Sequence, residues 1–328
     1  MGAVRASKPR FRRDGDVPRM ELTDDDVAIL RAVYRYRFAR ADDLYRLIGR
    51  SPDRLSRRLT LLFRNEYLDR PIAQIDRYRV GGSQPLVYGL GAAGARYLKK
   101  HGTPIGKTDW RSRNRTYTRE NLEHTLAVSR FLIDLELACR ATPGLSFIPF
   151  EDILAHAPER TQKSRNPMSW SVLLDWRGGT AAVNLVPDAI FGLRMERDGG
   201  KAVRSYYFLE MDRGTMTIAP SKAFQQSEAF PYRATILRKF YAYADSFKQL
   251  LHEYRFAVKM PRILFVTSSE ARAKAMRAAA CNLITKPLLV PSGVFLFGSS
   301  KHVGNLLQQQ FTTVDGSPCT MMNQRKTA

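Results

Sequence analysis

Between residues 21 and 68, apolar residues recur three times at the spacing of a helix face, and they predict three consecutive helices. The inner stripes are Val27, Leu30, Val33 and Tyr34, then Leu44, Leu47 and Ile48, then Leu55, Leu59, Leu62 and Phe63. Thr23 is a suitable N-cap for the first helix, and Gly49 is a suitable end for the second. Ser51 and Pro52 mark the start of the third helix.

Two short apolar runs and a fourth helix complete this first pattern. Residues 67–75 and 85–90 read as strands, and the basic, glycine-containing segment between them predicts a flexible wing. Residues 91–102 are expected to form the closing helix. The order helix, helix, helix, wing, helix is typical of a winged helix-turn-helix domain, which we assign to residues 21–103.

A basic tail, residues 1–20, precedes this domain, and residues 104–117 read as a basic linker to a second domain at residues 118–299. The second domain is predicted to have a helix at 119–141, strands at 145–153, 181–195 and 205–214, a helix at 234–255, a strand at 262–269, a helix at 270–283 and a strand at 293–300. The polar residues 300–328 are expected to be a poorly ordered tail. We therefore expect an α+β protein in which a winged helix domain is joined to an α/β domain.

The charge of the chain indicates a polyanion as its partner. Lys and Arg number 53 against 31 Asp and Glu, so the net charge is +22. Residues 1–119 hold 27 Lys and Arg against 13 Asp and Glu, a net charge of +14. The arginines expected on the outer face of the third helix and on the wing are Arg54, Arg57, Arg58, Arg77 and Arg79. This arrangement favours double-stranded DNA read by a recognition helix, although a merely solvated helix face would also be charged.

Other classes of protein find little support in the sequence. No apolar run approaches the roughly 20 residues that span a bilayer, so no membrane partner is expected. The three cysteines form no CxxC pair, which fits a cytoplasmic protein without a zinc site. The stretch GLGAAG, Gly89 to Gly94, matches a dinucleotide fingerprint, but no strand ending in an acid follows it. We expect no nucleotide cofactor, and we expect these glycines to ease the turn into the next helix.

Acidic residues lie on two strands of the second domain. Asp188 follows Pro187 in the second strand, and Glu210 and Asp212 end the third. Because side chains alternate along a strand, Glu210 and Asp212 project to the same side. If the hairpin register places Asp188 beside Glu210, three carboxylates converge, and Mg²⁺ or Mn²⁺ takes such oxygen ligands. The same acids are also compatible with a structural role at strand ends, paired with arginines.

These residues resemble the motif of the PD-(D/E)xK nuclease fold. The pair PD at Asp188 matches its first half, and EMD from Glu210 to Asp212 is similar to its second half, with Asp212 in place of lysine. The resemblance implies that Asp188 and Glu210 hold a metal ion and that a lysine orients or activates the attacking water. Lys239, on the following helix, is then the candidate for the amine, and Asp212 is a further candidate catalytic residue.

The motifs VYGLGAAGARYL, EHTLAVSRF, PDAIF, FLEMDRGT and LRKFYAYA together resemble the replication-relaxation family of plasmids and integrative elements. The resemblance spans roughly residues 20–270 and implies a role in the replication and relaxation of plasmid DNA. We predict a DNA-binding protein of a mobile element that acts as a Mg²⁺-dependent DNA endonuclease. The alternative is a non-catalytic replication or transcription regulator whose degenerate nuclease fold serves for homodimer formation or partner binding. The replacement of the motif's lysine by Asp212 favours the alternative, whereas the presence of both Asp188 and Glu210 favours catalysis.

Overall fold

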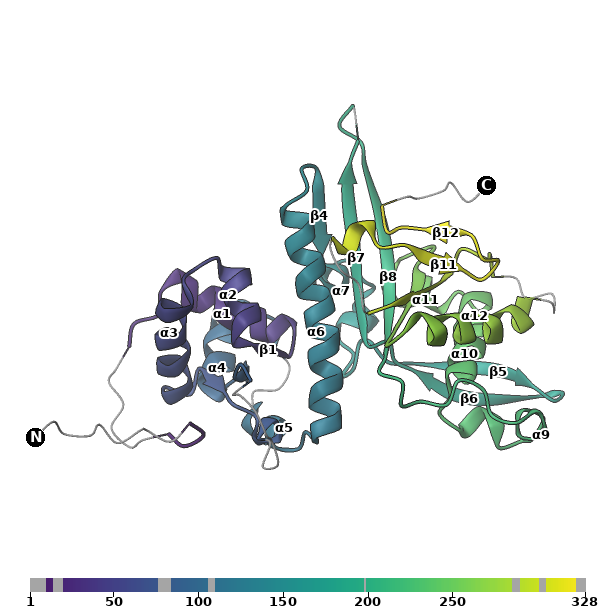
Figure 1. Ribbon diagram of the computed structural model, residues 1–328, viewed down its shortest axis with the longest axis horizontal. Coiled ribbons are helices and arrows are strands. Elements are labelled where there is room, and N and C mark those ends of the chain that lie inside the picture. The colour runs from purple at the N-terminus through teal and green to yellow at the C-terminus, as the bar shows by residue number, and fades with distance from the viewer. Residues whose placement is uncertain are drawn as a thin grey trace, which may run out of the picture. The chain divides into compact units, whose positions relative to one another are not determined.

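The computed structural model describes residues 10–13, 20–75, 84–105, 110–197, 199–284, 290–300 and 305–322. The fold is α+β, and the chain divides into two compact units, Met1–Ile133 and Asp134–Ala328 (Figure 1). In the described part of the chain, no helix is long and apolar enough to cross a membrane.

The first unit combines helices with a small antiparallel sheet. Its elements are α1 (Asp24–Arg35), β1 (Phe38–Arg40), α2 (Ala41–Ile48), α3 (Pro52–Arg64), β2 (Leu68–Asp69), the 3-10 helix η1 (Ile72–Gln74), β3 (Val87–Leu90), α4 (Ala92–Lys100), α5 (Trp110–Arg115) and most of α6 (Arg119–Arg140). β3 is the central strand and pairs with β1 and with β2.

The local signals of the first three helices are confirmed. The hydroxyl of Thr23 accepts from the backbone N–H of Asp26, while Asp26 accepts from the backbone N–H of Thr23, so both sides of a capping box are made. Gly49 ends α2 in the left-handed conformation, with φ of 69°. Most residues of the apolar stripes predicted for these helices are buried, whereas Val27, Tyr34 and Ile48 are half-buried.

Two expectations for the first unit are wrong. The strand expected at 67–75 is only two residues long, because Pro71 has no N–H to donate to a neighbouring strand and η1 follows it. The segment expected as a linker contains α5, in which Trp110 and Asn114 are buried. The side-chain amide of Asn114 donates to Asp69 and to the carbonyl of Leu90, which ties α5 to the sheet.

Gly91 and Gly94 bring the start of α4 against the backbone that precedes β2. The N–H of Gly91 donates to the carbonyl of Tyr67 at 2.9 Å. A Cβ on Gly91 would lie 2.1 Å from the carbonyl oxygen of Glu66, and one on Gly94 would lie 2.2 Å from that of Tyr67. Neither glycine has a positive φ. They therefore serve the close approach of two backbones and not the turn that we expected.

Replacing Gly94 by alanine should lower the free energy of unfolding of the first unit by about 1–3 kcal/mol, because the new Cβ meets backbone that cannot move aside. Alanine is favoured over glycine in a helix by about 1 kcal/mol. A net decrease in the free energy of unfolding is therefore attributable to the clash. Urea unfolding followed by circular dichroism measures the effect. Gly293→Ala is the control, since its Cβ meets nothing within 4 Å. A Gly94→Ala protein with the wild-type midpoint would contradict the prediction.

The second unit is built on a seven-stranded sheet with a separate hairpin. Its strands are β4 (Leu145–Ile148), β5 (Trp170–Trp176), β6 (Gly179–Leu185), β7 (Ala189–Glu196), β8 (Ala202–Asp212), β9 (Arg262–Thr267), β10 (Phe295–Ser299), β11 (Phe311–Thr313) and β12 (Pro318–Cys319). Its helices after α6 are α7 (Phe150–Ala155), α8 (Glu159–Gln162), α9 (Lys222–Gln225), η2 (Phe230–Tyr232), α10 (Ile236–Lys248), α11 (Leu251–Phe256), α12 (Glu270–Ile284) and η3 (Leu306–Gln308).

The strand order of the large sheet is β12-β11-β10-β9-β8-β7-β4. β9 runs parallel to both β8 and β10, and the other pairs are antiparallel. Between the parallel strands β8 and β9 the chain passes through α10, which packs with α12 on the sheet. β5 and β6 form a hairpin of their own against α10, where the indole N–H of Trp170 donates to the hydroxyl of Ser246 at 3.1 Å.

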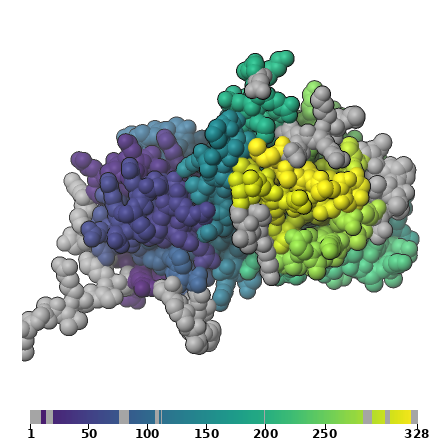
Figure 2. Space-filling model, turned by 45° about the horizontal axis from the view of Figure 1, so that its top comes forward, coloured from purple at the N-terminus to yellow at the C-terminus, as the bar shows by residue number. Residues whose placement is uncertain are grey.

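Three expectations for the second unit need correction. The strand expected at 145–153 stops before Pro149, and α7 takes its second half. The strand expected at 181–195 is split at Pro187 into β6 and β7, because proline offers no N–H for the ladder. The residues expected as a tail from 300 onward include β11 and β12, and Phe311 is fully buried. In Figure 2 these C-terminal residues, coloured yellow, lie against the light green segment that contains α12.

Candidate active site and nucleic-acid interface

The hairpin of β7 and β8 places Asp188 across from Glu210. Ala189 pairs with Leu209, and Asp188 is the residue before Ala189. The Oδ2 atom of Asp188 accepts a hydrogen bond from the backbone N–H of Met211 at 2.8 Å. The condition that we set on the hairpin register is therefore met for these two acids.

Glu210 points into the contact between the sheet and α10. Its side chain is 2% exposed. Oε1 accepts from the hydroxyl of Tyr243 at 2.6 Å, and Oε2 accepts from Nζ of Lys239. Lys239 and Tyr243 are four residues apart on α10, so they lie on the same face of the helix. Thr235 fixes the start of that helix, since its hydroxyl accepts from the N–H of Arg238 at 3.1 Å.

The two ionisable groups of this contact influence each other. Burial is the largest influence on Glu210 and raises its pKa, and the attraction of Lys239 only partly offsets it. Burial lowers the pKa of Lys239, but the negative charges of Glu210 and Asp188 outweigh burial, so the pKa lies above its ordinary value of 10.5. Lys239 is therefore an ammonium donor at neutral pH. The stability that it contributes is complete below pH 10.5 and is lost as the pH rises through its higher pKa in the folded state.

Asp212 is held by a different set of groups. Its Oδ2 atom accepts from Oγ1 of Thr267 at 2.6 Å and from the N–H of Gly214 at 3.1 Å. Arg272 of α12 donates to both carboxylate oxygens and to the carbonyl of Met216. Burial raises the pKa of Asp212, but the Arg272 hydrogen bond and its neighbours outweigh burial and the pKa is lowered. Asp212 thus fastens the turn after β8 to α12 and does not join the Lys239 contact.

Asp188 and Glu210 are the two carboxylates that this region could offer to a divalent ion. In the described ranges, no group of three or more His, Cys, Asp or Glu side chains could hold a metal ion. The expected convergence of three carboxylates is therefore not found in these ranges, and Asp212 is instead paired with Arg272. Asp188 and Glu210 remain as hard oxygen donors on neighbouring strands. Mg²⁺ is commonly bound through one or two carboxylates while it keeps several waters.

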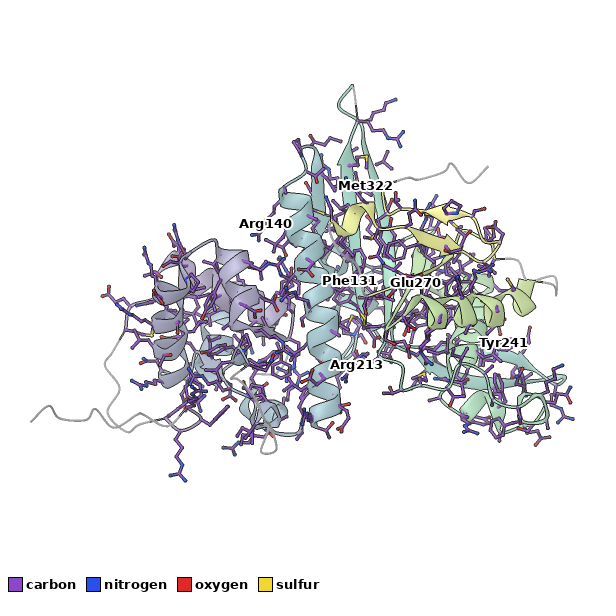
Figure 3. All side chains as sticks on the ribbon, viewed as in Figure 1. Phe131, Arg140, Arg213, Tyr241, Glu270 and Met322 are labelled. Carbon is purple, nitrogen blue, oxygen red and sulfur yellow. The ribbon has the colours of Figure 1, made fainter. Side chains whose placement is uncertain are left out.

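The sequence analysis did not predict two contacts of this region, that of Tyr243 with Glu210 and that of Arg272 with Asp212. Tyr243 was identifiable in principle, since it lies one helical turn after Lys239. Arg272 was not, because 60 residues separate it from Asp212. Arg213 and Glu270, both labelled in Figure 3, mark the two elements concerned, the end of β8 and the start of α12.

The three arginines predicted on the outer face of α3 do not share one environment. Arg54 and Arg57 are exposed. Arg58 donates through Nε to Asp26 at 3.0 Å, and its Nη2 donates to Asp26 and to the carbonyl of Glu21. Asp26 is fully buried. Arg58 is therefore a partner of a buried carboxylate, while the other two face solvent.

The remaining predicted DNA contacts belong to the wing. Arg77 and Arg79 lie outside the described residues, which stop at 75 and resume at 84. The strands before and after this segment, β2 and β3, pair antiparallel with each other.

Comparison with known proteins places the chain in a family. A model of the family described as replication-relaxation matches residues 30–252, more than half of the chain. This range includes α3 as well as Asp188, Glu210 and Lys239. No curated protein and no solved structure matches the chain. The chain belongs to the replication-relaxation family.

Proposed function

We propose that this protein binds double-stranded DNA through its first unit and cleaves a phosphodiester bond of DNA in its second, with Mg²⁺ or Mn²⁺ as cofactor. Membership of the replication-relaxation family indicates a role in the replication of a plasmid or another mobile element. The observation that carries the proposal is the contact of Lys239 with Glu210, beside Asp188. An amine and two carboxylates are the groups that the PD-(D/E)xK resemblance implies.

The strand order supports this comparison. β4, β7 and β8 form an antiparallel run, and β9 joins parallel to β8 after the crossover through α10. This is the α-β-β-β-α-β order expected from the sequence, with the hairpin of β5 and β6 as an insertion. The acids lie at the carboxyl end of β8, and ligands of α/β sheets commonly bind beyond this end of the strands.

The order of elements in the first unit supports DNA binding. β1 precedes α2 and α3, and the pair of β2 and β3 follows. This is the order of a winged helix domain with α3 as the recognition helix. Arg54 and Arg57 are the α3 side chains that we assign to DNA, with Arg77 and Arg79 assigned to it on the wing.

Each side chain of the second unit then has a defined part. Asp188 and Glu210 would hold the divalent ion, which when bound supplies a more acidic water and neutralises negative charge on the phosphate. Lys239 is protonated, so it orients Glu210 and adds positive charge where the transition state gains negative charge. Asp212 positions the turn after β8 and takes no part in proton transfer, because Arg272 and Thr267 occupy its carboxylate.

A nicking assay tests the proposed cleavage. Supercoiled plasmid incubated with the protein and Mg²⁺ should be converted to the open circle, and EDTA in place of Mg²⁺ should prevent the conversion. Supercoiled DNA that stays intact with both Mg²⁺ and Mn²⁺ would contradict the proposal.

Arg57→Ala should weaken duplex binding and reduce the slope of log affinity against log salt by about 1, because one phosphate contact is lost. Fluorescence anisotropy with a labelled duplex at several salt concentrations measures both quantities. Arg31→Ala is the matched control, since Arg31 is an exposed arginine on α1. An unchanged slope for Arg57→Ala would place the DNA surface elsewhere.

One observation favours the regulator as a second candidate. Both carboxylate oxygens of Glu210 already accept hydrogen bonds from side chains of α10. For this candidate, the acid is structural and the second unit is a platform for a partner or a second copy. Calorimetry separates the candidates, since the regulator should bind no Mn²⁺ at millimolar concentration.

A further inference from the structure

Within the described residues, Arg238 differs from Lys239 because one buried nitrogen of its side chain has no hydrogen-bond acceptor. Its Nε atom is buried and makes no hydrogen bond within the described residues. The neighbouring cation, Lys239, instead donates a hydrogen bond to Glu210. The backbone N–H of Arg238 donates to the hydroxyl of Thr235, so the donor without an acceptor within the described residues is the Nε–H of the side chain.

The position of Arg238 is unfavourable for a cation in the protein alone. It is the third residue of α10, and the first turn of a helix disfavours positive charge because the helix dipole is positive there. Burial lowers the pKa of Arg238, and the attraction of Glu210 is the opposing influence. In the chain, Arg238 directly precedes Lys239, the α10 lysine that donates to Glu210. A buried Nε–H without an acceptor costs free energy that a bound anion would recover.

We propose that Arg238 binds a backbone phosphate of the nucleic acid at the site of Asp188, Glu210 and Lys239. The planar guanidinium offers paired N–H donors that match two phosphate oxygens. Lys239 cannot take this part while it donates to Glu210, so the two adjacent cations have separate tasks. Lys239 orients the carboxylate, and Arg238 holds the phosphate next to it. This inference rests on the proposed function, since it takes the site to be one for phosphodiesters.

Thermal unfolding of the full-length protein with and without inorganic phosphate tests the assignment. In phosphate-free buffer, Arg238→Met should melt at the wild-type temperature or above, because the methionine replaces an unpaired buried charge. Phosphate should stabilise the wild type more than the variant, and calorimetry should give an affinity at least about tenfold weaker for Arg238→Met. Arg238→Lys should keep part of the affinity, because the charge remains and the paired donors are lost.

Arg233→Ala is the matched control. Arg233 is exposed, lies just before α10 and places its guanidinium over the ring of Phe224. Its replacement should leave phosphate affinity unchanged. Two results would overturn the assignment: an Arg238→Met protein that melts below the wild type without phosphate, which marks a structural arginine, or one that binds phosphate with wild-type affinity. A protein that binds phosphate through Arg238 but never nicks plasmid would contradict the proposed cleavage and leave the phosphate assignment intact.

Discussion

Replacing Lys239 by methionine should slow the nicking of supercoiled plasmid by about 100-fold or more, since removal of one preorganised donor at a reacting centre has an effect of this size. The ammonium of Lys239 donates to Glu210, which is 2% exposed and has no other cation bonded to it within the described residues. Without Lys239, Glu210 is expected to take up a proton, because burial already raises its pKa. Duplex affinity should stay unchanged, since the first unit carries the proposed DNA surface.

A second lysine of the same helix provides the control for this prediction. Lys248 lies at the end of α10 and pairs with Asp175 at the surface. Lys248→Met should nick plasmid at the wild-type rate. Time courses of the supercoiled and open-circle forms on agarose gels measure both variants. If Lys239→Met nicks as fast as the wild type, the amine has no catalytic part and its contact with Glu210 is structural.

Replacing Arg58 by alanine should lower the free energy of unfolding of the first unit by about 3–5 kcal/mol, because it leaves a buried carboxylate without its cation. Asp26 is fully buried and also forms the capping box of α1 with Thr23. Burial raises the pKa of Asp26, but the Arg58 hydrogen bond and its neighbours outweigh burial and lower the pKa below 3.8. The stabilisation is therefore complete above pH 3.8 and is lost as the pH falls through the lower pKa of the folded state.

Urea unfolding at neutral pH distinguishes this structural part from DNA contact. Arg57→Ala should keep the wild-type midpoint, because its side chain is exposed on the same helix. The double variant Asp26→Asn, Arg58→Ala should lose less than the sum of its single variants, since the unpaired buried charge is gone. An Arg58→Ala protein that unfolds at the wild-type urea concentration but fails to bind duplex would restore Arg58 to the DNA surface.

The sequence was sufficient for features that depend on neighbours along the chain. The caps of α1 and α2, the start of α3 and most of the apolar stripes follow from short spacings, and the structure confirms them. The pairing of Asp188 with Glu210 was also within reach, because the hairpin turn at Gly199 and Gly200 sets the register of β7 and β8. Lys239 was accessible for a similar reason, since α10 is the first long helix after β8 and its apolar spacing could be recognised in the sequence.

Features that depend on distant partners were not accessible. Asp212 looked like a third metal ligand because strand periodicity gives it the same side as Glu210. Periodicity does not reveal that Arg272 neutralises it from a helix 60 residues further along the chain. Arg58 likewise has the spacing of an outer helix face that Arg54 and Arg57 share. It nevertheless forms an ion pair with the buried Asp26 of α1.

Several missed strands were too short or too mixed to leave a signal. β11 and β12 have three and two residues, below the length at which alternation can be recognised. In β5 the outward positions include Leu173, which is 51% exposed and blurs the alternation. Gly91 and Gly94 matched a cofactor motif because close backbone contact and phosphate binding both exclude a side chain.

The rate of plasmid nicking by Asp188→Asn tests the central claim most directly. Asparagine keeps the shape of Asp188 and an oxygen that can accept from the N–H of Met211, so the fold should be retained. We predict that wild-type protein converts supercoiled plasmid to open circle with Mg²⁺, and that Asp188→Asn does so at least about 100-fold more slowly with an unchanged melting temperature and duplex affinity. An Asp188→Asn protein that nicks plasmid as fast as the wild type would contradict the account.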